Sequence, residues 1–125
     1  MFTKLILISL ATVSAFFTPS VKLSNGRTAS LKGRGPPVLF SPGLFGTMPP
    51  QFYSNVINSL TKNVTVVTFN DVLPITPNDI PDLADSLNVD TLTYFSHSSF
   101  NPDILESDRI NNAVLIDPIV IPNFD

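Results

Sequence analysis

Thr-Leu-Thr-Tyr-Phe-Ser-His-Ser-Ser-Phe, at residues 91–100, is the stretch that decides how the rest of the chain is interpreted. Its first half, residues 91–95, has the aromatic and β-branched side chains that are typical of a buried strand. A cluster of small polar residues follows, and residues 101–109 then have room for about two helical turns. A sharp turn from a strand into a helix lifts a serine above the sheet, next to free backbone N–H groups. The stretch therefore predicts a nucleophile, Ser98, at the end of a strand.

The remainder of the folded part alternates between apolar strands and amphipathic helices. Strands are predicted at residues 38–41, 64–69 and 113–117, where apolar and β-branched residues run almost without interruption. Helices are predicted at residues 49–62, which carry an apolar stripe at helical spacing, and after a capping sequence at residues 76–79. Such alternation is typical of βαβ units. We therefore expect an α/β fold with a parallel sheet of about four strands and helices on both faces.

The composition limits both the size of the protein and its chemistry. The chain has 125 residues, of which 43% are hydrophobic and 14% are charged, and this indicates a single globular domain. It contains no cysteine and only one histidine, His97, so disulfides, cysteine-based zinc sites and histidine metal cages are excluded. A dinucleotide fingerprint, G-x-G-x-x-G behind a strand, is also absent from the sequence. We therefore expect neither a metal nor any other cofactor.

Charge is distributed unevenly along the chain, although the net charge is only −3. Every lysine and arginine except Arg109 precedes Asp71, which is the first acidic residue. This pattern indicates a basic leader in front of an acidic domain. Because the acidic part carries no basic patch, nucleic acid is not an expected partner.

The first 35 residues have the composition of a targeting leader. Residues 1–15 fit a signal peptide, with Lys4 near the start, a short apolar stretch, and small residues ending at Ala15. The apolar stretch is too short to span a bilayer. Residues 16–35 are basic and free of acids, and Ala-Phe-Phe-Thr-Pro at residues 15–19 resembles the junction of bipartite plastid leaders. The resemblance implies import into a plastid by the secretory route. The alternative is a secreted protein in which this basic segment is a flexible linker.

From residue 36 to residue 120 the order of motifs resembles the α/β-hydrolase family of serine esterases and lipases. The first predicted strand ends in Ser-Pro-Gly-Leu at residues 41–44, where family members place their oxyanion-hole loop. The serine stretch follows two elements later, and Val-Leu-Ile-Asp-Pro at residues 114–118 is similar to the strand that follows the nucleophile helix. The resemblance implies a partial α/β-hydrolase-like domain at residues 36–125.

The resemblance also implies roles for four residues. Ser98 is the nucleophile that attacks an ester or similar acyl carbon, and the backbone N–H groups of Leu44 and Ser99 hold the developing oxyanion. Asp117 takes the position at which some members place the acid of the triad. A residue that caps the end of a strand is the alternative interpretation of Asp117. The expected partner of an active form is a small-molecule ester.

Two features depart from the pattern of the family. Ser96 and Phe100 stand where glycines normally flank the nucleophile, and the bulk of Phe100 conflicts with a tight turn. His97 is the only histidine, but neighbouring side chains on a strand point apart, so we do not expect it to be the base. The resemblance implies a structural role for it. Because the triad needs a histidine after the acid in chain order, this chain as written is expected to be inactive as an esterase.

Three interpretations of the whole chain follow. It is the first half of a longer serine hydrolase, a degenerate hydrolase that binds a ligand or partner without catalysis, or an unrelated α/β protein. In the strand order of hydrolases, residues 64–69 and 113–117 form the two edges of the sheet, and apolar edges invite pairing with another chain. If the chain is complete, we therefore expect a homodimer or a dedicated partner at an open sheet edge.

Overall fold

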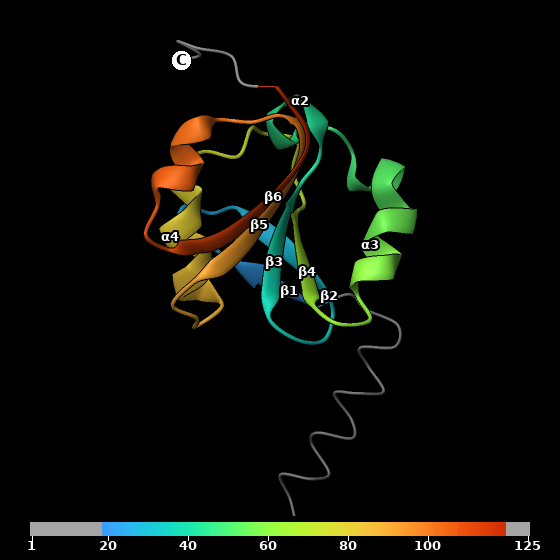
Figure 1. The fold of residues 1–125 in the computed structure, drawn as a ribbon. Coiled ribbons are helices and arrows are strands. Elements are labelled where there is room, and N and C mark those ends of the chain that lie inside the picture. The colour runs from blue at the N-terminus through green and yellow to red at the C-terminus, as the bar shows by residue number, and fades with distance from the viewer. Residues whose placement is uncertain (1–18, 120–125) are drawn as a thin grey trace, which may run out of the picture.

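The computed structural model describes residues 19–119, so the predicted signal peptide at residues 1–15 and the segment 120–125 lie outside the described part. One six-stranded sheet forms the centre of the protein, with strand order β1-β2-β4-β3-β5-β6 (Figure 1). The strands are β1 (Ser20–Lys22), β2 (Thr28–Gly33), β3 (Pro37–Ser41), β4 (Thr65–Phe69), β5 (Leu92–Ser99) and β6 (Ile110–Ile119). The helical elements are α2 (Gly43–Gly46), η1 (Pro50–Tyr53), α3 (Ser54–Leu60), α4 (Asp79–Ser86) and η2 (Pro102–Glu106).

Parallel strands make up the middle of the sheet and one of its edges. β3 pairs in parallel with β4 and with β5, and β5 pairs in parallel with β6. Leu39 on β3 lies opposite Val67 on β4 and Tyr94 on β5, which aligns the three strands in register. The predicted α/β class with a parallel sheet is therefore confirmed. All four predicted strands are present, and two further strands extend the sheet.

The two additional strands come from residues 20–33, for which a transit segment or a flexible linker was predicted. β1 and β2 form an antiparallel hairpin, and β2 pairs antiparallel with β4. The prediction that β4 forms an edge of the sheet is therefore wrong. The hairpin turns at Asn25-Gly26, where Gly26 adopts a φ of 91°, and Ala29 on β2 is fully buried. An Asn-Gly turn in front of alternating buried residues is a hairpin signal that the basic composition obscured.

Arg27 joins this hairpin to the rest of the domain. Its guanidinium forms ion pairs with Asp71 and Asp79, each at an N–O distance of 2.7 Å, and lies 3.9 Å from the ring centroid of Phe69. The side chains of Arg27 and Asp79 are only 10% and 4% exposed. Burial by itself raises the pKa of Asp71. The hydrogen bonds from Arg27 and from the backbone N–H of Leu73, together with the positive charge of Arg27, outweigh this effect, so the pKa of Asp71 lies below its usual value. The hairpin is thus an integral part of the folded domain.

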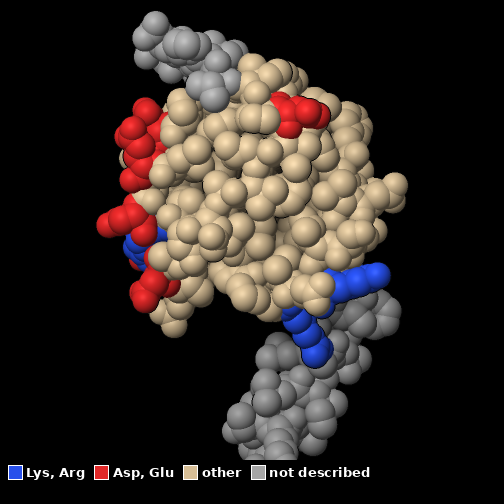
Figure 2. Space-filling view, viewed as in Figure 1, with Lys and Arg blue, Asp and Glu red and all other residues tan. Residues whose placement is uncertain are grey.

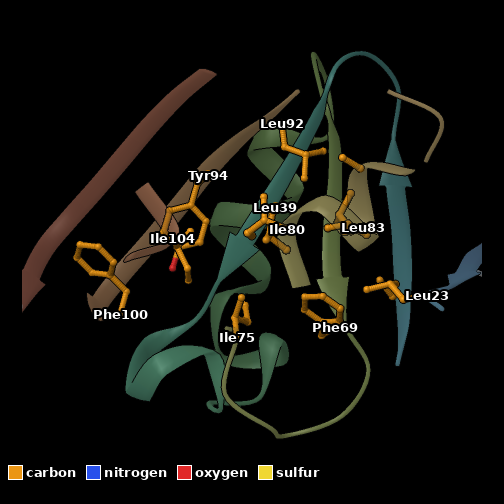
Figure 3. Packing of buried hydrophobic residues seen from close by; sticks show 13 residues of the cluster. Leu23, Leu39, Phe69, Ile75, Ile80, Leu83, Leu92, Tyr94, Phe100 and Ile104 are labelled. Carbon is orange, nitrogen blue, oxygen red and sulfur yellow. The ribbon is translucent and has the colours of Figure 1, made fainter. Parts of the chain in front are cut away.

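Helices cover both faces of the sheet, as the sequence predicted. α4 packs on one face and α3 on the other (Figure 1). Neighbouring residues on one strand point to opposite faces, so Leu39 packs in the cluster under α4 whereas Phe40 packs in the cluster under α3. The cluster under α4 is the larger one (Figure 3), and its aromatic and large aliphatic members are Leu23, Leu39, Phe69, Ile75, Ile80, Leu83, Leu92, Tyr94, Phe100 and Ile104.

The surface is unevenly charged. Figure 2 shows acidic side chains gathered on the side where α4 lies, while most of the face in view carries no charge. Among residues 19–119 there is no helix of the length and apolar character that crossing a membrane requires.

Candidate active site

The carboxyl ends of β3 and β5 lie side by side and carry the two motifs that the sequence singled out. Ser41 and Ser96 are register partners in this parallel pair. The loop that contains α2 follows β3 directly and packs against β5. Leu44 and Ser98 are thereby brought to the same end of the sheet, as the order of the motifs predicted.

The loop after β3 has a strained backbone. Leu44, Phe45 and Gly46 have φ values of 56°, 61° and 88°, in the left-handed region that residues other than glycine rarely adopt. The N–H of Gly46 donates to the carbonyl of Pro42 at 2.9 Å, and the N–H of Ile75 donates to the carbonyl of Phe45 at 2.9 Å. Strain of this kind costs about 1–3 kcal/mol per residue and concentrates at functional sites. The loop is therefore a candidate for the predicted oxyanion-binding segment.

Ser98 also has a left-handed backbone, with a φ of 68°. It lies at an irregularity in the pairing of β5 with β6, between His97, which pairs with Ile116, and Ser99, which pairs with Ile119. The predicted sharp turn into a helix is absent, because β5 continues through Ser99 and only the short 3-10 helix η2 follows. Ser98 is therefore held in its unusual conformation by a bulge between two strands and not by a strand-to-helix turn.

Phe100 shows why the chain departs from the predicted turn. Its side chain is 2% exposed and belongs to the cluster under α4, with its ring centroid 6.1 Å from that of Tyr94. Ile104 from η2 is buried in the same cluster. The bulky residue thus fills the core at the point where a tight turn needs a small residue. The predicted conflict between Phe100 and the turn is resolved by loss of the turn.

His97 and Tyr53 form a hydrogen-bonded bridge beside the site. Tyr53 Oη lies 2.8 Å from Nδ1 of His97, and it accepts a hydrogen bond of 3.0 Å from the N–H of Gly43. The rings of Tyr53 and His97 meet edge to face, with centroids 5.4 Å apart. Sequence reasoning missed Tyr53, because an aromatic residue in an apolar helical segment is indistinguishable from a core residue. His97 has a structural contact here, which is the role that we expected for it.

Asp117 lies on β6 at the irregularity that faces Ser98. Its neighbour Ile116 pairs with His97, and Asp117 itself is exposed and has a φ of 46°. β6 continues past it to Ile119, and both interpretations of Asp117, as the acid and as a cap, stay predictions. Position alone keeps Asp117 as the candidate acid.

Three buried hydroxyl groups lie beneath the site. Ser41, Tyr94 and Ser96 are 0%, 0% and 1% exposed, and their oxygens have no hydrogen-bond partner among the described residues. Burial raises the pKa of Tyr94, and the hydroxyls of Ser41 and Ser96 lie close enough to oppose that rise in part without reaching the geometry of a hydrogen bond. A buried hydroxyl without a partner destabilises a fold by about 1–3 kcal/mol. The ends of β3 and β5 are therefore not optimised for stability.

Replacing Tyr94 by Phe is expected to raise the free energy of unfolding by about 1 kcal/mol at neutral pH, because it removes the unpartnered hydroxyl and keeps the ring. The fold holds the neutral phenol, so its contribution is present below the unfolded pKa of 10.0 and declines as the pH rises above it. Urea unfolding at neutral pH and at about pH 11 measures both effects. The variant should lose less stability than the wild type on going to alkaline pH. A variant less stable than the wild type at neutral pH would mean that the hydroxyl has a partner.

Two surface hollows of the described part do not include the residues of this candidate site. Two surface hollows lie beside β2, β4 and η1, with Ser30, Gln51 and Thr68 lining both, and neither is lined by Ser98 or Leu44. Within residues 19–119, no three histidine, cysteine, aspartate or glutamate side chains come together as metal ligands would.

The chain is similar to known proteins in structure. No protein-family model and no curated protein matches the chain. A membrane phospholipase A, described as a bacterial virulence factor, superimposes with a TM-score of 0.65 at 17% identity, over 98% of this chain and 47% of that one. An epoxide hydrolase of the α/β-hydrolase superfamily, from metagenomes of hot environments, superimposes with a TM-score of 0.62 at 18% identity, over 82% and 42%. A putative α/β hydrolase from Nostoc gives 0.51 at 15% identity, over 65% and 34%. The chain spans less than half the length of these structures.

Proposed function

Because the chain has the fold of α/β hydrolases, we propose that it is the nucleophile-bearing part of a serine hydrolase that acts on ester or related acyl bonds. One observation carries the proposal. Leu44 and Ser98 both have left-handed backbones, and they lie at the adjacent ends of two paired strands. Strained residues of this kind persist only where the surrounding structure holds them, and they cluster at active sites.

The chemistry follows from the groups at these strand ends. Ser98 Oγ attacks the acyl carbon, and negative charge develops on the acyl oxygen. The backbone N–H groups of Leu44 and Ser99 are the proposed donors to that oxygen. Each such donor is typically worth about 3 kcal/mol of barrier, so a correctly formed loop matters as much as the nucleophile.

The proton of Ser98 has to pass to a base. His97 is unsuited to this role, because its Nδ1 is engaged by Tyr53 and its side chain alternates with that of Ser98 along the strand. The chain contains no other histidine. We therefore propose that the base is a histidine supplied from outside these residues.

Labelling of the endogenous protein with a fluorophosphonate tests the proposal, because an activated serine forms a stable adduct with this reagent. We expect one adduct, located on Ser98 by mass spectrometry of peptides, and none after denaturation. The native transcript should be sequenced through its 3′ end from the same material. The proposal fails if the reading frame supplies a histidine beyond Asp125 and Ser98 still remains unlabelled.

The alternative function is a non-catalytic module that binds through the open edge at β6. Among residues 19–119, β6 is the last strand in the sheet order and has no strand on its outer side, and Val114, Ile116 and Ile119 on it are 41%, 43% and 51% exposed. An unpaired apolar edge is a template for another strand. Under the first proposal that strand belongs to the same polypeptide, whereas under the alternative it belongs to a second copy of the chain.

If the alternative holds, sedimentation equilibrium of the 125-residue chain should show a dimer at rising concentration. Ile116→Lys should then weaken the dimer by at least about 10-fold, because an ammonium group at the strand interface has to be desolvated. Val72→Lys is the matched control, since Val72 is also exposed and apolar but lies in the loop after β4. A monomer at every concentration, or equal effects of the two substitutions, contradicts the alternative.

A further inference from the structure

We infer that Tyr53 is a positioning residue that fixes the oxyanion loop against the strand that carries the nucleophile. The inference rests on the proposed function for its catalytic meaning. Gly43 immediately precedes Leu44, and His97 immediately precedes Ser98. The single oxygen of Tyr53 lies 3.0 Å from the backbone nitrogen of Gly43 and 2.8 Å from Nδ1 of His97. One hydroxyl therefore joins the residue before the proposed oxyanion donor to the residue before the nucleophile.

The ring of Tyr53 is held so that its oxygen stays in place. Its centroid lies 5.2 Å from that of Phe40 in an edge-to-face contact at 64°, and the ring packs against the cluster under α3 that includes Ile57 and Val66. Phe40 and Val66 belong to the central strands β3 and β4, which do not move relative to each other without breaking the sheet. Tyr53 thus holds the loop in a fixed position relative to the sheet.

Gly43 has no side chain and so leaves room for the hydroxyl of Tyr53. A Cβ atom at Gly43 would lie 3.1 Å from the hydroxyl oxygen of Tyr53 and 3.6 Å from Nδ1 of His97. The first distance is shorter than ordinary van der Waals contact, so a side chain here has to push the hydroxyl away. The glycine at this position therefore permits the close approach of the tyrosine.

The donors and acceptors of the bridge define a direction. The N–H of Gly43 donates to the oxygen of Tyr53, and the hydroxyl proton of Tyr53 is then free to be donated to Nδ1 of His97. A neutral His97 that accepts at Nδ1 carries its own proton on Nε2. With Tyr53 as the donor we expect His97 to be the Nε2–H tautomer, whereas a proton on Nδ1 would reverse the direction of this hydrogen bond and leave the bridge in place. The tautomer is observable without any activity.

Nuclear magnetic resonance on the 125-residue chain tests the bridge directly. In the wild type we expect the ¹⁵N shift of His97 Nδ1 to be that of an unprotonated nitrogen, and the amide of Gly43 to exchange slowly. Tyr53→Phe keeps the ring and removes the hydroxyl, and should speed exchange of the Gly43 amide by about 5- to 10-fold. Tyr94→Phe is the matched control, because it deletes the only other tyrosine hydroxyl, which makes no hydrogen bond with Gly43 or His97.

The catalytic consequence is measured on the complete protein. Tyr53→Phe should slow fluorophosphonate labelling of Ser98 by about 10- to 100-fold, because a loop misplaced by a fraction of an ångström loses its alignment with the nucleophile. Gly43→Ala, which displaces the same hydroxyl, should give a similar loss while Tyr53 remains intact. Tyr94→Phe should label at the wild-type rate.

The outcomes separate the inference from the proposed function. Gly43 exchange that is unchanged in Tyr53→Phe overturns the inference. Wild-type labelling rates in both Tyr53→Phe and Gly43→Ala also overturn it. If Ser98 is not labelled in any form of the complete protein, the proposed function fails, and the amide exchange of Gly43 still decides whether Tyr53 holds the loop.

Discussion

Replacing Ser98 by Ala in the complete protein is expected to lower kcat for ester hydrolysis by at least about 10³-fold. The loss is large because no acyl-enzyme can form without the nucleophile, and the oxyanion donors with substrate binding supply only residual catalysis. KM should change little, since the substitution removes an interaction made in the reaction and not in binding. Hydrolysis of p-nitrophenyl esters with acyl chains of increasing length measures both constants and reports the preferred acyl group.

Two further substitutions make this result specific. Ser59→Ala removes an exposed serine of α3 and should retain full activity. Ser98→Gly should also be inactive, but it should gain up to about 1 kcal/mol of stability, because glycine adopts the φ of 68° without strain. Loss of activity together with a gain in stability would indicate that the strained backbone at Ser98 is retained because the reaction requires it. A Ser98→Ala protein that retains more than about a tenth of the wild-type kcat would exclude Ser98 as the nucleophile.

Replacing Arg27 by Ala is expected to lower the free energy of unfolding by about 3–5 kcal/mol. The buried carboxylate of Asp79, which is 3% exposed, loses the ion pair that compensates its desolvation. The variant also loses the ion pair with Asp71 and the contact with the ring of Phe69. A loss of this size is a large fraction of the total stability of a small domain. Urea unfolding of the 125-residue chain, followed by far-UV circular dichroism, measures it.

Arg34→Ala is the matched control, since Arg34 lies just beyond the same hairpin and is exposed. It should change the stability by less than about 0.5 kcal/mol. Arg27→Lys should recover only part of the loss, because an ammonium group cannot bridge two carboxylates in the fork geometry of a guanidinium. Equal stabilities of Arg27→Ala and Arg34→Ala would show that the hairpin is a dispensable addition to the sheet, as a transit segment or linker would be.

The parallel part of the sheet could be predicted from the sequence because buried parallel strands consist of continuous runs of apolar residues. Residues 38–41 and 64–69 lie within or next to β3 and β4, and their order gave the α/β class. The prediction failed for β2, in which Ala29 and Leu31 face the core and alternate with Ser30 and Lys32. Alternation of this kind is the normal pattern of an antiparallel strand, but the basic composition of the segment suggested a leader.

The site was predicted in outline and missed in detail. The order of the motifs was enough to bring Leu44 and Ser98 together, because the carboxyl ends of neighbouring parallel strands meet at one edge of a sheet. In the helix predicted at residues 49–62, Phe52 is 72% exposed, whereas its neighbour Tyr53 carries the contact with the site. A 3-10 turn at η1 shifts the phase of the helix by enough to exchange the two.

A crystal structure of the complete protein with a fluorophosphonate adduct is the most direct test of the proposed site. We expect the phosphorus to be bonded to Ser98 Oγ, with its phosphoryl oxygen about 2.7–3.1 Å from the backbone nitrogens of Leu44 and Ser99. The left-handed backbone of Leu44 and Ser98 should be unchanged by the adduct. An adduct on another serine, or a phosphoryl oxygen that points away from both nitrogens, would contradict the assignment of this strand end as the active site.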